Sequence, residues 1–489
     1  MKKYCLYFIA LILLTACTQK PDGNVSMASR QPEIYPDYTD VTIPQNIAPM
    51  NFLVREEGCE AVQVEVNGDD DGSRIVVNAN GNEVVFAMDE WKSLLQKPHK
   101  KPLTVTLTAR INGQWTQFRP FSWTVAPEKI DPVLTYRLIE PDYEVWSNVE
   151  LWQRNVENFD ESTLSSYKEV GDRCMNCHTF SNQDPQLSML YVRGEGGGAF
   201  LNEKGKLTKL NIKDEGMVSG SVYFGFSPSG RYITFSSNII IPAFHTIPGK
   251  RLEVFDSKSD VYVADLQTHT IISSPLTSDS LAFETFPTFS PDGRYVYFCS
   301  APHVDLPGGI KQLKYRLCRI AFDEKSGTLG ETVDTLRLAN QGNVSVSHPR
   351  ISPDGRWLLY TVSDYGTFPI WHPEADLRLM DLKTGEIVEM KGVNSQKSDT
   401  YHSWSSNSRW FVFASKRDDG LYGKPYFCHV DASGHVSKPF CLPQKNPSRY
   451  DNMLKSFNAP ELGKGALPFN AADVARAMKQ QATPFHLHP

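Results

Sequence analysis

The sequence has few long runs of apolar residues. The one extended apolar stretch lies at the start, from Tyr4 to Leu14, behind the basic residues Lys2 and Lys3. No later stretch approaches the roughly 20 residues that a membrane-spanning helix needs. Basic residues, a short apolar segment and then small residues are typical of a secretory signal. We therefore expect the protein to be exported.

The signal ends in Leu14-Thr15-Ala16-Cys17, which resembles the lipobox of bacterial lipoproteins. This resemblance implies a signal peptide over residues 1–16, cleavage before Cys17 and lipidation of Cys17. The alternative is an ordinary signal peptide with an unrelated cysteine. Residue 18 is Thr rather than Asp, so nothing indicates retention in the inner membrane. We expect an outer-membrane lipoprotein whose body faces the periplasm, with exposure at the cell surface as the other arrangement.

A strong excess of charge of one sign is also missing. The chain has 50 Lys and Arg against 56 Asp and Glu, a net charge of −6, and no basic patch, which argues against a nucleic-acid partner. It contains no Gly-x-Ser-x-Gly elbow, which argues against a hydrolase of that type. We favour a protein that is not a classical enzyme, and the sequence leaves open whether any substrate is turned over. With 489 residues, 40% of them hydrophobic, it can form more than one globular domain.

A repeated motif dominates the second half of the sequence. A turn of Ser-Pro-Asp-Gly type, an arginine and an alternating apolar strand recur at intervals of roughly 60 residues. The four copies are FSPSGRYITFSS from Phe226, FSPDGRYVYFCS from Phe289, ISPDGRWLLYTVS from Ile351 and WSSNSRWFVFASK from Trp404. A second strand follows each copy, which is the pattern of β-propeller blades. A β-sandwich would not explain four copies of one motif.

These segments resemble the TolB-type propeller repeat over about residues 179–442. The resemblance implies an all-β propeller but says little about function, because such propellers act as docking platforms, lids and sensors. We expect six blades. Four are the clear repeats, one is a diverged blade before them, and one is built from strands near residue 140 together with the C-terminal part of the chain. That shared blade would close the ring without a free edge.

The remaining segments define the domain plan. Strand-like segments separated by turns predict a β-sandwich of immunoglobulin or fibronectin type over residues 31–130, after a linker at 17–30. The propeller is expected over 131–460. A tail at 461–489 has a helical pattern with Asn470 as its N-cap.

The most specific local motif is Cys174-Met-Asn-Cys177-His178. Two cysteines at this spacing can form thioethers to haem vinyl groups, and the adjacent histidine can bind the iron. A zinc site would need two further ligands, and no second Cys-x-x-Cys exists. A redox or structural disulfide is the other alternative, although no thioredoxin-like pattern surrounds the motif. His178 lies two residues before Phe180, where the diverged blade begins, so the motif is expected at the mouth of the central channel.

The whole chain resembles a group of Bacteroidetes lipoproteins that combine a TolB-like propeller with this haem-type motif. The resemblance does not define an activity. From the motif and the propeller we expect a covalent haem c held by Cys174, Cys177 and His178, in a protein that transfers or senses electrons and docks an unidentified envelope partner. The alternative is a TolB-like interaction scaffold in the envelope that carries no haem.

A second axial ligand for the iron is expected near the same channel mouth. His402 occupies the position in its blade that His178 occupies in its own, so it is the first candidate. His348 lies one position earlier, and simple strand alternation would point it to the other face. Met189 has a competing role in core packing, and Met453 lies in the tail.

Other cysteines and polar clusters favour structural roles. Cys299 with Cys318, and Cys428 with Cys441, lie on consecutive strands and could form disulfides if their Cα atoms fall within about 7 Å. Cys59 is expected to be a buried thiol. The acidic triplet 69–71 predicts a solvated turn rather than a calcium site. His486 and His488 are expected in a loose tail rather than a metal site.

Overall fold

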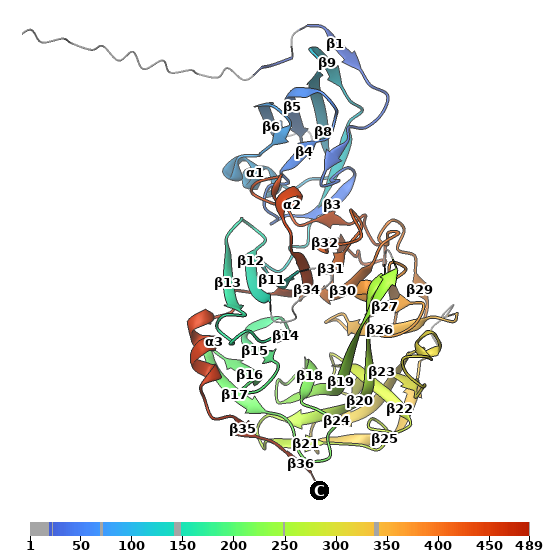
Figure 1. Ribbon diagram of the computed structural model, residues 1–489. Coiled ribbons are helices and arrows are strands. Elements are labelled where there is room, and N and C mark those ends of the chain that lie inside the picture. The colour runs from blue at the N-terminus through green and yellow to red at the C-terminus, as the bar shows by residue number, and fades with distance from the viewer. Residues whose placement is uncertain are drawn as a thin grey trace, which may run out of the picture.

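A computed structural model describes residues 19–21, 23–68, 72–140, 148–247, 250–336 and 342–488. It contains an N-terminal β-sandwich above a ring of six β-sheets around a central channel (Figure 1). The predicted all-β architecture, with six propeller blades behind a small sandwich, is confirmed. Within the part of the chain that is described, no helix has the length and apolar character of a membrane span.

The N-terminal domain consists of two sheets and one helix. The larger sheet contains β1 (Val25–Met27), β3 (Val41–Pro44), β5 (Cys59–Asn67), β6 (Arg74–Asn80), β8 (Leu103–Ile111), β9 (Gln114–Gln117) and β10 (Phe121–Ala126). The smaller sheet contains β2 (Ile34–Tyr35), β4 (Phe52–Val54) and β7 (Glu83–Val84). Two features differ from expectation: β1 pairs with β9 although it lies in the predicted linker, and α1 (Met88–Leu95) was not anticipated. The amphipathic α1 buries Trp91, Leu94 and Leu95 against the sandwich.

The six blades follow one another in chain order around the ring. Blade 1 contains β11 (Val133–Ile139), β12 (Val149–Asn155), β13 (Glu161–Ser166) and β34 (Ser456–Gly463); blade 2 contains β14 (Met175–Ser181), β15 (Asp184–Val192), β16 (Gly198–Glu203) and β17 (Lys206–Asn211). Blade 3 contains β18 (Ser221–Phe226), β19 (Tyr232–Ile247), β20 (Lys250–Asp265) and β21 (Thr270–Ile272); blade 4 contains β22 (Ala282–Phe289), β23 (Tyr295–Pro302), β24 (Arg316–Asp323) and β25 (Thr328–Thr335). Blade 5 contains β26 (Ser345–Ile351), β27 (Trp357–Ser363), β28 (Asp376–Asp381) and β29 (Ile387–Val388); blade 6 contains β30 (Asp399–Trp404), β31 (Trp410–Ser415), β32 (Lys424–His429) and β33 (Phe440–Cys441).

The two ends of the propeller meet in blade 1, as predicted. The C-terminal β34 pairs antiparallel with β11, from Val133 opposite Gly463 to Ile139 opposite Ser456, and forms the innermost strand. This pairing closes the ring, because the C-terminal strand covers the inner edge of β11 and completes the first blade.

The tail then runs back along the outside of the ring (Figure 1). Its helix α3 (Ala471–Met478) begins at the predicted cap Asn470, whose side chain accepts from the backbone of Ala472 and Asp473 in a capping box. Two short strands beyond it, β35 (Thr483–Pro484) and β36 (His486–Leu487), pair with β17 and β21. The end of the chain is therefore fixed to blades 2 and 3 instead of being a loose tail.

The repeated motif forms the turn between the inner two strands of a blade. In blade 4 the Ser290 hydroxyl contacts Asp292 at 2.6 Å and accepts from the backbone N–H of Tyr295 at 3.0 Å, while Gly293 has φ +72°. In blade 3 the motif arginine, Arg231, pairs with Asp265 at the end of β20 at 2.6 Å. The serine, glycine and arginine of the repeat thus stabilise a turn that needs a left-handed residue.

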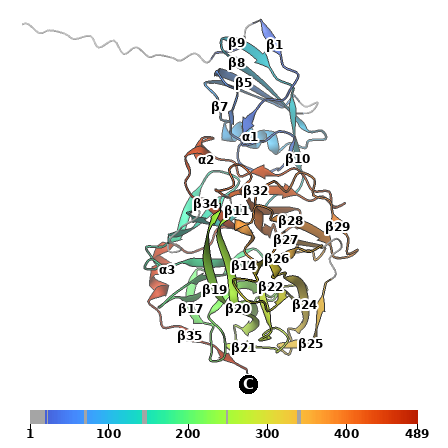
Figure 2. The same cartoon turned by 45° about the vertical axis from the view of Figure 1, so that its right-hand side comes forward.

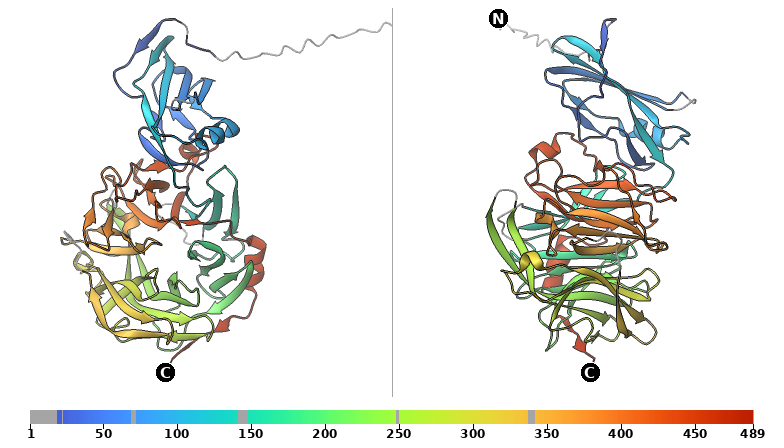
Figure 3. Two further views of the ribbon diagram at one scale, coloured as in Figure 1. Left: turned by 180° about the vertical axis from the view of Figure 1, so that it is seen from behind. Right: turned by 90° about the vertical axis from the view of Figure 1, so that its right-hand side faces the viewer.

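A long hairpin departs from the repeat. β19 and β20 have 16 residues each, whereas the other blade strands have at most nine. The hairpin rises from blade 3 along one face of the ring (Figures 2 and 3). We call residues 238–258 the arm.

The sandwich sits on the outer side of the ring and is held there by polar contacts. Lys438 contacts Asp37 at 2.7 Å, Tyr35 donates to Asp418 at 2.9 Å, and Asn51 donates to the carbonyl of Gln444 at 3.1 Å. Apolar residues of both domains also form one continuous core, in which Phe52 lies with Phe457.

Candidate functional site

The innermost strands share an irregularity at one level of the channel. A register shift occurs in each of β14, β18, β22, β26 and β30 against its neighbour, and between β34 and β11. The residues at this level with positive φ are Tyr223 (+55°), Phe286 (+51°), His348 (+51°), Tyr401 (+47°) and Ala459 (+45°). The corresponding position in β14 is Cys177. Bulges of this kind bend a strand and redirect a side chain.

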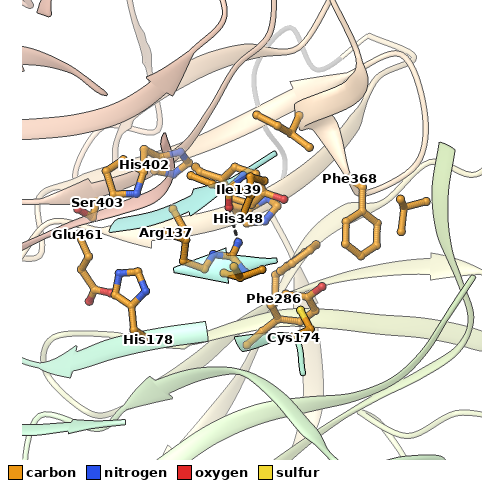
Figure 4. Close-up of a pocket in the computed structure, with 18 of the residues that line it drawn as sticks. Arg137, Ile139, Cys174, His178, Phe286, His348, Phe368, His402, Ser403 and Glu461 are labelled. Carbon is orange, nitrogen blue, oxygen red and sulfur yellow. Dashed lines mark hydrogen bonds between the residues drawn. The ribbon is translucent and has the colours of Figure 1, made fainter. Parts of the chain in front are cut away.

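These bulges surround a cavity of about 190 Å³ in the channel (Figure 4). Its wall combines aromatic and aliphatic side chains with three arginines and three histidines. The residues that matter below are Arg137, Cys174, His178, Arg193, Tyr223, Ile240, Val254, Phe286, His348, Arg350, Phe368, Ile370, Trp371, Tyr401, His402, Ala459 and Glu461. Every blade contributes, so the site exists only in the closed ring.

Aromatic rings form a belt along one side of the cavity. Ring centroids are 4.5 Å apart for Tyr223 and Phe286, 3.9 Å for Phe286 and His348, and 4.8 Å for His348 and Tyr401. The belt covers blades 3 to 6 and is interrupted at blade 1 by the small side chain of Ala459. The cysteine-histidine motif of blade 2 lies beside this interruption.

His178 is the predicted metal ligand, and the structure places it in the cavity wall. Its side chain is 8% exposed, and neither ring nitrogen makes a hydrogen bond of normal geometry with the described residues. Burial, assisted by the nearby Arg137 guanidinium, lowers the pKa of His178 to about 3. The imidazole is therefore neutral at physiological pH, which is the form that binds metals.

The cysteines of the motif are only partly described. Cys174 lines the same cavity as His178. Cys177 lies on β14 at the bulge, where two residues oppose the single Leu190, and its side chain lies outside the described residues. Cys17 and the acidic triplet 69–71 also lie outside the described residues.

His402 and His348 reach the same cavity. His402 is there as predicted, and its Nε2 lies 2.9 Å from the carbonyl oxygen of Leu359. The expectation that His348 faces away is wrong, because the bulge in β26 reverses the simple alternation of the strand. Met189 is 2% exposed in the core between blades 2 and 3, and Met453 lines a separate surface pocket. Neither methionine lines the channel cavity.

Charged groups in the cavity were not anticipated from the sequence. Arg137, Arg193 and Arg350 come from three different blades. Burial raises the pKa of Glu461 to about 7, against the opposing effects of the Phe180 N–H, Arg350 and the Thr179 hydroxyl. Its carboxyl accepts from the Phe180 N–H at 3.1 Å. Of these groups, only Arg350 could have been found from the sequence, because it lies two residues after His348, the bulge position of its repeat.

The two disulfides that the sequence left open are not formed. Cys299, Cys318, Cys428 and Cys441 are buried free thiols. In blade 4, Cys299 pairs with Leu317 and Cys318 with Phe298, so the two sulfurs face opposite sides of the sheet. Cys59 is a partly buried free thiol. The described residues contain no cluster of three His, Cys, Asp or Glu side chains that could hold a metal ion.

Known proteins show only distant similarity to this chain. No protein-family model and no curated protein matches the sequence. Among solved structures, tricorn protease has 12% identity and a TM-score of 0.36, with 80% of this chain and 38% of that chain covered.

Two further structures are similar at the same level. A periplasmic gluconolactonase from Pseudomonas aeruginosa has 17% identity and a TM-score of 0.34, over 67% of this chain and 99% of that one. Prolyl oligopeptidase B from Galerina marginata has 12% identity and a TM-score of 0.32, over 62% and 43%. This chain thus spans less than half of the length of tricorn protease and prolyl oligopeptidase B. These identities are too low to transfer an activity.

Proposed function

We propose that this protein is a c-type haem lipoprotein of the cell envelope, which transfers or senses electrons and docks a partner protein through its propeller. The observation that carries the proposal is His178. It belongs to a Cys-x-x-Cys-His motif and is buried and neutral. Its ring nitrogens make no hydrogen bond of normal geometry with the described residues, in a cavity that Cys174 also lines. A buried polar group without a partner is costly and requires an explanation.

The chain's own residues suit each part of a haem. Cys174 and Cys177 would form the thioethers, and His178 would bind the iron. Aromatic and aliphatic side chains of the cavity would cover the apolar macrocycle, and the guanidinium groups of Arg193 and Arg350 would face its carboxylates. The haem would supply one-electron redox chemistry. The protein would hold it, exclude water and set its electrostatic environment.

The location follows from the lipoprotein signal. Attachment of haem to a Cys-x-x-Cys-His motif takes place outside the cytoplasm, where this signal would direct the chain. Lipidation at Cys17 would hold the protein on the outer membrane.

The first prediction tests covalent attachment. Replacement of both Cys174 and Cys177 by Ala should abolish haem staining of the protein on a denaturing gel, because no thioether can form. The replacement of Cys299 by Ala is the matched control, since Cys299 is a buried thiol on blade 4 outside the cavity, and it should keep full staining.

Two results would count against the proposal. Haem staining that survives the double replacement would exclude attachment through this motif. Wild-type protein without a Soret band, produced in cells with an active haem-attachment system, would favour the interaction scaffold that carries no haem.

A further inference from the structure

Three histidines reach the channel cavity from three blades. His178 belongs to blade 2, His348 to blade 5 and His402 to blade 6. The six blades pack in chain order, and blade 6 contacts blade 1 through β30 and β34, so the ring is closed. Blades 2 and 5 are three steps apart in this ring of six. His178 and His348 therefore approach the channel from opposite sides, whereas His402 comes from an oblique direction.

The two opposed residues also belong to equivalent bulges and lie one position apart in the register of the repeat. His178 is the second residue of the bulge in β14, and His348 is the first residue of the equivalent bulge in β26. The positive φ of His348, +51°, is uncommon for a residue other than glycine. This backbone conformation turns the His348 ring toward the axis, where it forms part of the aromatic belt.

The hydrogen bonds distinguish the three rings. His402 is already engaged, with Nε2 at 2.9 Å from the carbonyl oxygen of Leu359. Among the described residues, both ring nitrogens of His178 and the Nδ1 of His348 are buried without a hydrogen-bond partner, although the two side chains are only 8% and 6% exposed. Burial, reinforced by Arg350, lowers the pKa of His348 well below its ordinary value, so this ring is neutral as well. Two imidazoles thus enter one cavity from opposite sides, each with at least one buried ring nitrogen that lacks a hydrogen bond among the described residues.

Neighbouring rings hold His348 in place. Phe286 packs against it with centroids 3.9 Å apart and planes at 32°, and Tyr401 meets it edge-on at 4.8 Å. Such contacts fix the orientation of the imidazole before any ligand arrives, and a rigid ligand loses little entropy on binding.

On the basis of the proposed haem, we propose that His348 is the second axial ligand, so that the iron is held between His178 of blade 2 and His348 of blade 5. His402 is then a structural residue that ties blade 6 to the Leu359 carbonyl of blade 5. Both axial positions of the iron are occupied. This assignment favours electron transfer to a docked partner over the binding of a small gaseous ligand at an open iron.

The test compares single replacements in the intact haem-bound protein. Wild-type protein should show a low-spin, six-coordinate spectrum in both oxidation states. His348→Ala should keep the covalent haem and shift the ferric absorbance and resonance Raman markers to high spin. Added imidazole should restore the low-spin spectrum, because it can fill the position that the side chain left. The exposed His435 provides the matched control, and His435→Ala should leave the spectrum unchanged.

His402→Ala tests the rival assignment, in which His402 is the second axial ligand. A high-spin spectrum in His402→Ala together with an unchanged spectrum in His348→Ala would overturn the proposal and assign the position to His402. An already high-spin wild type, or a low-spin spectrum unaffected by either change, would overturn it as well. If His348→Ala does not fold, His348→Met decides: a change to a histidine–methionine spectrum supports the assignment, and an unchanged one overturns it. Loss of all covalent haem from wild type would instead refute the proposed function.

Discussion

At the scale of single residues, burial of neutral histidines makes stability depend on pH. Burial lowers the pKa of both His178 and His402 to about 3, whereas an unfolded histidine titrates near 6.5. The folded protein therefore binds fewer protons than the unfolded chain between these two pH values. The stability that these residues contribute is fully present above about pH 6.5 and is lost as the pH falls toward 3.

The pH prediction uses His402→Gln, which keeps a donor for the Leu359 carbonyl but cannot titrate. Between pH 7 and 5, wild type should lose about 2 kcal/mol more free energy of unfolding than the variant, because one unfolded histidine gains its proton in that range. Urea denaturation at both pH values measures the difference. Burial raises the pKa of Asp256 to about 7 and that of Glu284 to about 8, with the opposite effect on stability. Wild type and His402→Gln both contain these two groups, so their contributions cancel when the two proteins are compared.

The exposed His435 gives the control for this experiment. His435→Gln should follow wild type at both pH values. If His402→Gln follows wild type too, the buried histidine does not keep its lowered pKa in the folded protein.

At the scale of elements, the arm forms part of the wall of the cavity. Ile240 and Val254 of the arm line the cavity together with Phe368, Ile370 and Trp371, the last two in η2 (Pro369–Trp371). His372 follows η2 and joins the two elements. Its Nε2 lies 2.9 Å from Glu253 of β20, and its Nδ1 lies 2.9 Å from Glu374. Tyr365 also donates to Glu253 at 2.9 Å.

The element prediction is that His372→Ala loosens the arm. His372 and Glu253 have side chains only 0% and 4% exposed, so the change leaves a buried carboxylate without its main partner. Breaking a buried pair in this way costs about 3–5 kcal/mol. The thermal midpoint should fall, and amide hydrogen exchange should rise in residues 250–258 more than in blade 6.

Arg55→Ala is the comparison, because its ion pair with Asp451 is exposed on both sides and should contribute little. A His372→Ala variant as stable as Arg55→Ala, with unchanged exchange in the arm, would show that the cluster does not hold the arm in place.

At the scale of the whole molecule, the order of the domains matters for the proposed lipid anchor. In the order of the chain, the sandwich of residues 25–126 comes between Cys17 and the propeller, and it lies at one side of the ring (Figure 1). In a lipoprotein anchored at Cys17, the sandwich would hold the channel away from the membrane surface, where a partner can reach it.

The anchor prediction concerns Cys17→Ala, which should release the protein from sedimented membranes into the soluble fraction. Each buried CH₂ of an acyl chain contributes about 0.8 kcal/mol to membrane binding, and all of this is lost without the modified cysteine. Cys59→Ala, at a partly buried thiol of the sandwich, should remain with the membranes. Protein that still sediments after Cys17→Ala would indicate attachment through a membrane-bound partner.

Local patterns in the sequence were sufficient for most of the architecture. The Ser-Pro-Asp-Gly turns and alternating strands predicted the blades because both depend on neighbouring residues. Asn470 predicted the start of α3 for the same reason. Closure through β34 could be expected because pairing a C-terminal strand with the first strands of the propeller joins the two ends of the ring.

What only the tertiary structure decided is which side chains meet in the channel. Strand alternation placed His348 on the wrong face, because a bulge with positive φ depends on the packing of a neighbouring strand and not on local spacing. Pairing register likewise kept Cys299 and Cys318 apart, although they lie on consecutive strands. The motif Cys174-x-x-Cys177-His178 can be recognised from the sequence alone. Its opposition to His348 is a property of six blades closing into a ring, because ring closure places blades 2 and 5 on opposite sides of one channel although the two residues are 170 positions apart.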